Sequence, residues 1–468
     1  MVERTISSIH RLSNRFFRST DLIRDFNDPH GLDGYWLTDF GRTCLSRIAT
    51  GLQHNSGRRA WRLTGDFGSG KSSFALLLAS TFSERQRSLP KGLKQRVFEE
   101  VPEAKNLQFI PVLVVGNREA LAPAILRALY ATLSELFSRG TKSSLALDIE
   151  KALSRKIRVA DKEVLDFIQS ANSKIIESGK GGGLLFILDE VGKFLEFAAI
   201  NPDQQDVYFL QQLAEMAARS GKKPIVVVCL FHQGFSAYTE QLTESTRREW
   251  EKIAGRFEEI LFQQPLDQIA LLISSALAVD TQKIPEAIKK QSEDSLAQAI
   301  HLGWFGTSAS RETLKRLQHR FFPLDPMLLP VLVRAFHRFG QNERSLFSFL
   351  CSYEPFGLRA FSNSLLSDKS KPYRLADFFD YLRTNFGHRL AVANYQAHWN
   401  VIESIIEAFY ADNPEELRVI KTVGVLNLVN GDDFLPTQEA ICWAVAGNSV
   451  AHRLEVVTIL KKFVHRGS

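Results

Sequence analysis

Cysteines and long apolar runs are scarce in this chain of 468 residues. Its four cysteines are scattered, with no C-x-x-C pair and no histidine at metal-ligand spacing, which argues against a disulfide framework and a zinc site. The longest apolar runs, such as Ile225–Phe231, are far shorter than the roughly 20 residues that span a bilayer. The N-terminal segment is polar and arginine-bearing, unlike a signal peptide. These features predict a cytoplasmic protein with buried thiols and no membrane contact.

The composition is that of a folded protein, with 44% hydrophobic and 24% charged residues. A chain of this length can bury more than one core, which predicts two or three domains. The net charge of +6 favours an acidic partner such as DNA or RNA. Because the basic excess is spread along the chain, charge alone leaves nucleic-acid binding open.

Continuous apolar stretches alternating with helical patterns predict an α/β fold with a parallel five-stranded sheet. Because these stretches do not alternate with polar residues, both faces of the sheet are expected to be covered by helices. Two further helices, 144–154 and 161–177, indicate an insertion between the second and third strands. The chain is predicted to be helical after residue 262. The expected strands are 58–65, 107–116, 183–190, 224–232 and 257–262.

The stretch TGDFGSGKSS matches the pattern G-x-x-x-x-G-K-[ST], which binds phosphate. Its glycines let backbone N–H groups face phosphate oxygens, and the N-terminus of the following helix favours the same anion. Lys71 is predicted to reach the β- and γ-phosphates of ATP, and the Ser72 hydroxyl to bind Mg²⁺. The predicted ATP cradle consists of Gly65, Asp66, Phe67, Gly68, Ser69, Gly70, Lys71, Ser72 and Ser73.

The stretch LLFILDE places two carboxylates directly after a buried strand. Ligands of open parallel sheets bind in the crevice at the carboxyl ends of the strands, so both side chains should reach the phosphate site. We expect Asp189 to complete the Mg²⁺ site and Glu190 to orient and deprotonate the attacking water.

The glycine cradle, ILDE and KIAGRFEEILF together resemble the AAA+ ATPases. The resemblance implies that Arg256 of GRF is an arginine finger that enters the site of a neighbouring subunit, so that the active unit is a homo-oligomer. It also implies that Arg344, in FGQNERSLFSFL, is the second sensor on the lid. The first sensor follows the fourth core strand, where the chain offers His232 or Gln233 and departs from the usual small polar residue.

The same resemblance, to the initiator-like and signal-transducing branches in particular, predicts a division of the chain. Tyr35 or Trp36 would lie near the adenine base, although aromatic residues at such positions are more often part of a core. The predicted parts are an N-terminal helical segment contributing to the adenine pocket (1–55), the AAA+ core (56–264), a helical lid (265–360) and a C-terminal helical domain (361–468).

Three short helices in succession near the C-terminus resemble part of a winged-helix domain. Lys461, Lys462 and Arg466 near the end of the last helix would then face DNA, although basic residues also suit a helix C-terminus. Winged helices serve protein docking as well, so an effector protein is the other expected partner. Because the hairpin of such a domain is missing, we expect either a bare helical bundle or the front part of a longer protein.

Three segments resemble the sequences of large ATPases of bacterial anti-phage defence systems of the BREX kind. They are RRAWRLTGDFGSGKSSFALLLA, GRFEEILF and GQNERSLFSFL. The resemblance covers residues 30 to 360 and implies an oligomeric ATPase that drives conformational change or assembly. The alternative is a nucleotide-gated scaffold, such as a DNA loader or sensor, with little turnover. A metabolic P-loop kinase is disfavoured because no cluster of lid arginines is evident.

Overall fold

The chain forms two compact units, which are described separately. One is an α/β unit, Thr20–Gln263, and the other is a helical unit that combines Met1–Ser19 with Gln264–Ser468. No helix among the described residues is both long and apolar enough to cross a membrane. The computed structural model describes residues 5–12, 20–53, 56–66, 68–138, 144–155, 157, 159–201, 206–232, 251–339, 346–364, 366, 370–391, 396–408, 413–431 and 434–466.

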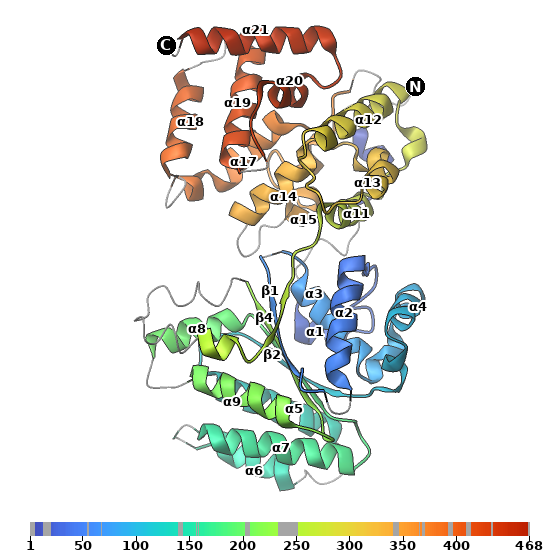
Figure 1. Ribbon diagram of the computed structural model, residues 1–468, viewed down its shortest axis with the longest axis vertical. Coiled ribbons are helices and arrows are strands. Elements are labelled where there is room, and N and C mark those ends of the chain that lie inside the picture. Colours follow the sequence, from blue (N-terminus) through green and yellow to red (C-terminus); the bar gives the residue numbers. More distant parts are fainter. Residues whose placement is uncertain are drawn as a thin grey trace. The chain divides into compact units, whose positions relative to one another are not determined.

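The α/β unit is built on one five-stranded parallel sheet in the order β2-β3-β4-β1-β5 (Figure 1). The predicted α/β fold with a five-stranded parallel sheet is therefore confirmed. Because all strands run the same way, β1, β3 and β4, which are neighbours, end at the same edge. The strands are β1 (Ala60–Thr64), β2 (Ile110–Val115), β3 (Leu184–Asp189), β4 (Ile225–Phe231) and β5 (Glu258–Leu261).

Helices cover both faces of this sheet, as the apolar strands require (Figure 1). Along β3, Leu184, Phe186 and Leu188 pack on one side, and Leu185 and Ile187 pack on the other. The first face is covered by α5 (Leu121–Leu136), α6 (Ser144–Leu153), α7 (Asp161–Glu177), α8 (Val191–Ile200) and α9 (Asp206–Arg219). The second face is covered by α1 (Leu22–Asn27), α2 (Asp39–Leu52), α3 (Lys71–Thr81) and α4 (Lys91–Glu100). Helices α6 and α7 correspond to the predicted insertion.

The helical unit has one extensive core, which runs from α11 to α21. Phe349 is fully buried there among the rings of Tyr373, Phe378 and Tyr381. The helices are α11 (Leu266–Leu277), α12 (Glu286–His301), α13 (Arg311–Leu317), α14 (Leu328–Phe339), α15 (Leu346–Cys351), α16 (Leu358–Phe361), α17 (Leu375–Leu390), α18 (Gln396–Ala408), α19 (Pro414–Leu428), α20 (Gln438–Ala446) and α21 (Val450–Arg466). The predicted boundary between a lid and a C-terminal domain at residue 360 lies within this shared core, so that division stays a prediction.

The first residues of the chain belong to the helical unit. Ile6 and Ile9 are buried with Ile284 and Ile288, and the Arg11 N–H donates to the Leu277 carbonyl at 3.1 Å. The predicted segment 1–55 is therefore divided, because its first apolar residues pack against helices far along the chain.

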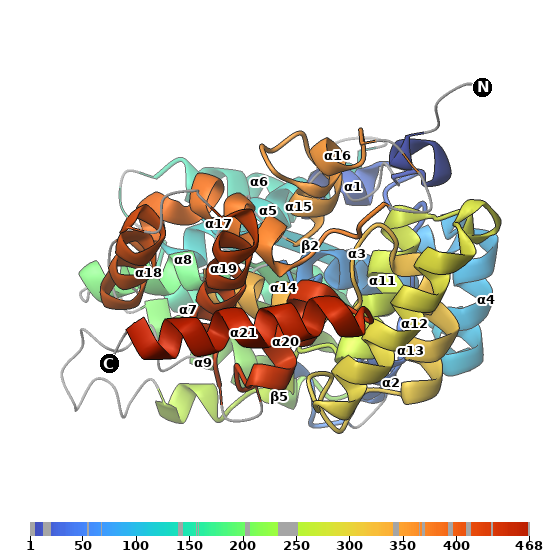
Figure 2. The same ribbon diagram turned by 90° about the horizontal axis from the view of Figure 1, so that it is seen from above.

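The last three helices occur as the sequence predicts. Helix α21 packs against α19 and α20 (Figure 2). Lys462 forms an ion pair with Glu416 of α19, whereas Lys461 is exposed. Contact of this helix with DNA stays a prediction.

Candidate nucleotide-binding site

The glycine-rich turn joins the end of β1 to the start of α3. Gly68 and Gly70 adopt left-handed backbone conformations, with φ of 74° and 91°, which residues bearing a Cβ rarely adopt. A Cβ on Gly65 would lie 2.5 Å from the Phe262 carbonyl oxygen, so that position also excludes a side chain. Phe67 lies outside the described residues. The glycine pattern thus corresponds to a tight turn that leads into a helix N-terminus, the geometry that favours anions.

Lys71 is buried inside this turn and is only 3% exposed. Its Nζ donates to the carbonyl oxygens of Gly65 and Asp66 at 2.5 and 2.7 Å, and to Ser69 Oγ at 3.3 Å. Burial lowers the pKa of Lys71 to about 8, against the opposing effect of Asp189 and Asp66. An anion in the turn would therefore meet a buried ammonium group whose direct hydrogen-bond partners are neutral oxygens.

The adjoining edge of β3 brings a carboxylate to the turn. Asp189 Oδ1 accepts a hydrogen bond from the Glu190 N–H at 2.8 Å. Burial raises the pKa of Asp189, while the nearby Ser72 hydroxyl, this hydrogen bond and the charge of Lys71 lower it. The structure therefore brings Asp189, at the end of β3, to Lys71 and Ser72, at the start of α3. Ser73, the last predicted cradle residue, shares a hydrogen bond with Thr20.

The donor set fits the Mg²⁺ ion that the motif implies. Hydroxyl and carboxylate oxygens are the ligands that Mg²⁺ prefers, and it commonly takes the remaining ones from water and substrate phosphates. Among the described residues, no group of three or more histidine, cysteine or acidic side chains is placed to hold a metal ion alone. A metal at Ser72 and Asp189 would therefore depend on a bound nucleotide for further ligands.

Glu190 stands at the same edge in a left-handed conformation, with φ of 52°. Its Oε2 pairs with Lys193 Nζ at 2.5 Å, and its Oε1 lies 3.9 Å from His232 Nε2. Gly116, after β2, donates its N–H to the Asp189 carbonyl at 2.8 Å, and a Cβ there would lie 2.1 Å from the Glu190 carbonyl oxygen. Neither Lys193 nor Gly116 was expected at the site; the only signal in the sequence is a glycine at a strand end and a lysine one helical turn after Glu190.

His232 follows β4, between the segments that carry Lys71 and Glu190. Burial, then the charges of Lys71 and Lys193, lower its pKa to about 3. The imidazole is therefore neutral at physiological pH. The structure places this candidate first sensor beside Glu190, whereas Gln233, the other candidate, lies outside the described residues.

Of the two arginines with a predicted role, the structure describes Arg256. Arg256 lies in the turn before β5, is 55% exposed, and pairs with Glu215 Oε1 of α9 at 3.5 Å. Arg344 lies outside the described residues. Of the aromatic candidates for the adenine pocket, Tyr35 packs against the core on the α3 face, and Trp36 lies under the Arg96 guanidinium, 4.1 Å from the ring centroid.

No protein-family model matches the chain, and no curated protein matches it significantly. Among solved structures, the ORC2 protein of Aeropyrum pernix in ADPNP and ADP complexes aligns with 97% of this chain and 90% of its own, at 12% identity and a TM-score of 0.36. This similarity is too weak to carry an argument. The strand order with the cradle after β1 and the acidic pair after β3 is nevertheless typical of AAA+ ATPases, as the motifs predict.

Lys71 makes nucleotide affinity depend on pH. Its pKa near 8 in the free chain must rise when a phosphate binds, so binding above pH 8 takes up a proton. We expect the Kd for ATP to be constant below pH 8 and to rise above it, by up to about tenfold per pH unit. Calorimetry at alkaline pH in two buffers of different ionisation enthalpy measures the proton uptake. The Lys71→Arg variant, whose guanidinium stays charged, serves as the control, and equal wild-type affinity on both sides of pH 8 would contradict this prediction.

Gly116→Ala tests the position of the acidic pair. The new Cβ would clash with the carbonyl group of Glu190, so the backbone at Glu190 must shift while the cradle stays intact. We expect ATP binding to persist and turnover to fall by about tenfold or more. Gly92→Ala on α4 is the matched control, because a Cβ there has nothing within 4 Å. Unchanged turnover in Gly116→Ala would show that the placement of Glu190 does not matter.

Proposed function

We propose that the chain is an AAA+ ATPase that hydrolyses ATP to ADP and phosphate. The observation that carries this proposal is that Lys71, inside the turn, and Ser72 lie next to Asp189, with Glu190 next in sequence. An ammonium group, a hydroxyl and two carboxylates lie at one edge of the sheet. These are groups that phosphoryl transfer uses, because the reaction relies on positioning and charge stabilisation.

Each residue has a separate task in this proposal. Lys71 and the turn N–H groups bind the phosphates, and Ser72 and Asp189 hold Mg²⁺. When bound, the metal supplies charge neutralisation at the phosphate oxygens. Glu190 accepts the proton of the attacking water, and the neutral His232 beside it orients a polar group by hydrogen bonding.

We further propose that the active unit is a homo-oligomer. The exposed Arg256 is accessible to a neighbouring chain, where its guanidinium would stabilise the charge that develops on the transferring phosphoryl group. Arg344 would act as the second sensor and couple the bound nucleotide to the helical unit. The insertion α6–α7 and the succession of helices in the described C-terminal part favour the initiator-like or signal-transducing branches of AAA+.

The proposed biological role rests on the resemblance of the sequence motifs to those of defence ATPases. We propose a role in bacterial anti-phage defence, in which ATP hydrolysis drives conformational change or assembly together with an effector protein. DNA or RNA is a further partner in this proposal, supported by the net charge of +6 and by the exposed Lys461.

A second function is favoured by two specific contacts. Glu190 is held by Lys193, and Arg256 is held by Glu215, so both residues assigned to hydrolysis are engaged in ion pairs. A single chain in this state would bind ATP and hydrolyse it slowly. This describes a nucleotide-gated switch, which turns over ATP only when assembly or a partner breaks these pairs.

Glu190→Gln separates binding from hydrolysis. The amide keeps the shape of the side chain but cannot accept the proton, so we expect the Kd for ATP to stay within about threefold and turnover to fall by at least about a hundredfold. Measurement requires nucleotide binding and phosphate release on the same preparation. Glu196 is an exposed carboxylate on α8, the helix that follows Glu190, and it pairs with Arg118; Glu196→Gln should leave both quantities unchanged. An active Glu190→Gln would exclude this residue as the base, and a wild type that neither binds nor cleaves ATP under any partner condition would overturn the proposed function.

Arg256→Ala tests the finger across subunits. Alone, Arg256→Ala and Glu190→Gln should both be inactive, the first without a finger and the second without a base. Mixed together, they should regain part of the wild-type phosphate release, because mixed assemblies join an intact Glu190 to an intact Arg256. Arg155→Ala, another exposed arginine in an ion pair, should stay active alone. Mixtures no more active than their components, at concentrations where the chains associate, would rule out action across subunits.

A further inference from the structure

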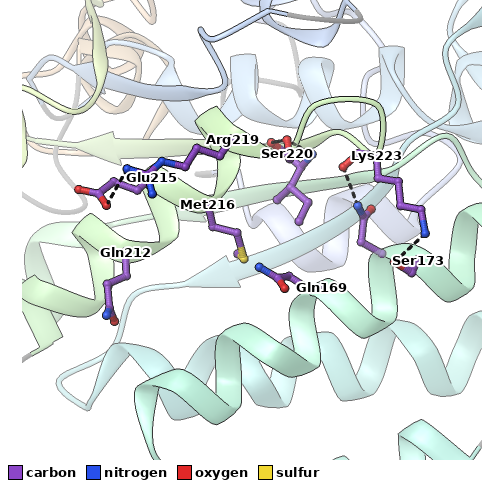
Figure 3. A pocket seen from close by; sticks show the side chains of 10 residues that line it. Gln169, Ser173, Gln212, Glu215, Met216, Arg219, Ser220 and Lys223 are labelled. Atoms are coloured by element: carbon purple, nitrogen blue, oxygen red, sulfur yellow. Dashed lines mark hydrogen bonds and ion pairs between the residues drawn. The ribbon is translucent and has the colours of Figure 1, made fainter.

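A cavity of about 440 Å³ lies between α7 and α9 of the α/β unit. It opens beside Ile225, the first residue of β4, and therefore belongs to the edge of the sheet opposite the phosphate cradle. In Figure 3, Gln169 of α7 and Met216 of α9 point toward one another across it. Its volume suits a small molecule or a single long side chain.

Two amide oxygens lining this cavity are buried without a hydrogen-bond partner among the described residues. They are Asn172 Oδ1 on α7 and Gln212 Oε1 on α9. Asn172 is only 2% exposed, and its Nδ2 is already committed to the Lys223 carbonyl at 2.9 Å. Buried acceptors without a donor destabilise a protein, so their occurrence on both walls of one cavity indicates a missing donor.

The cavity is lined by one carboxylate, Glu215, and two cations, Arg219 and Lys223. Lys223 Nζ is already bound by Glu177 and Ser173, at 2.9 and 3.0 Å. Arg219 is 82% exposed and lies 3.9 Å from Glu215. A ligand would meet the two neutral acceptors, and a cationic one would compete for Glu215, whose Oε1 accepts from Gln211 Nε2 at 2.9 Å and pairs with Arg256 at 3.5 Å.

We propose that this cavity binds a ligand with a guanidinium or ammonium group. Its N–H groups would donate to Asn172 and Gln212, and its charge would pair with Glu215. These groups have N–H donors in several directions, which suits acceptors on opposite walls. A free diamine and the side chain of an arginine or lysine share this chemistry.

A ligand bound in this cavity would affect Arg256. This step rests on the proposed role of Arg256 as the arginine finger. Glu215 Oε1 holds Arg256 at 3.5 Å, so a second cation at Glu215 competes with that pair. The ligand would thereby release Arg256 and favour its use by a neighbouring chain. The cavity is thus a regulatory site for the ATPase.

Binding is tested on the full chain without nucleotide, so the result does not depend on hydrolysis. Agmatine is titrated by calorimetry, and a blocked tetrapeptide with one central arginine is titrated in parallel. Gln212→Met replaces the acceptor with an apolar side chain of similar shape. We expect it to weaken binding by about fivefold or more, with an undiminished melting temperature because the lost oxygen had no partner. Gln95→Met, on the exposed face of α4, is the control and should bind like wild type.

The outcomes distinguish the two sources of the ligand and test the effect of the cavity on Arg256. Binding of agmatine but not of the peptide identifies a free small molecule, and preference for the peptide identifies a protein side chain. No heat from either up to about 10 mM, with the chain folded, would overturn the proposal and leave a cavity that holds water only. Binding that Gln212→Met does not weaken would overturn it equally. Agmatine could bind while neither agmatine nor the Glu215→Gln substitution raises the rate of ATP hydrolysis. That result would support the binding site and contradict its link to Arg256.

Discussion

The approach of Lys71 and Ser72, in the first turn of α3, to Asp189, at the end of β3, is the constraint on which the candidate site depends. It follows from the order of the adjacent parallel strands β3, β4 and β1 in the sheet. Three adjacent parallel strands therefore deliver the cradle, His232 and the acidic pair to one edge. Burial of Lys71 and Asp189 in this crevice costs free energy in the absence of ligand, as their shifted pKa values indicate, and that cost favours binding of an anion and a metal.

Two residues with a proposed role in hydrolysis are held in ion pairs, Glu190 at this edge and Arg256 before β5. Lys193 neutralises Glu190, and Glu215 occupies Arg256, so the isolated chain resembles a resting state. Both restraints are ion pairs of partly exposed side chains, which contribute little to stability and break readily. Regulation through assembly or through a ligand at Glu215 would therefore need only small changes in free energy.

The phosphate turn and the acidic pair could be predicted because each depends on local sequence: glycines define the turn, and a buried apolar strand carries the two carboxylates at its end. The five strands and the inserted helices α6 and α7 could be predicted from apolar patterning for the same reason. The partners of the reactive side chains could not be predicted. Lys193 is one lysine among many, and Glu215 meets Arg256 only through tertiary packing. Likewise, the place of Ile6 and Ile9 in the helical unit depends on contacts with residues far along the chain.

The central claim is that the turn around Lys71 binds ATP and that Asp189 completes its magnesium site. An experimental structure of the chain with Mg²⁺ and a slowly hydrolysed ATP analogue tests it most directly. The account predicts the triphosphate in the turn, with the Ser72 hydroxyl about 2.1 Å from the metal and Asp189 beside it. A nucleotide bound elsewhere, or a metal remote from Asp189, would contradict it.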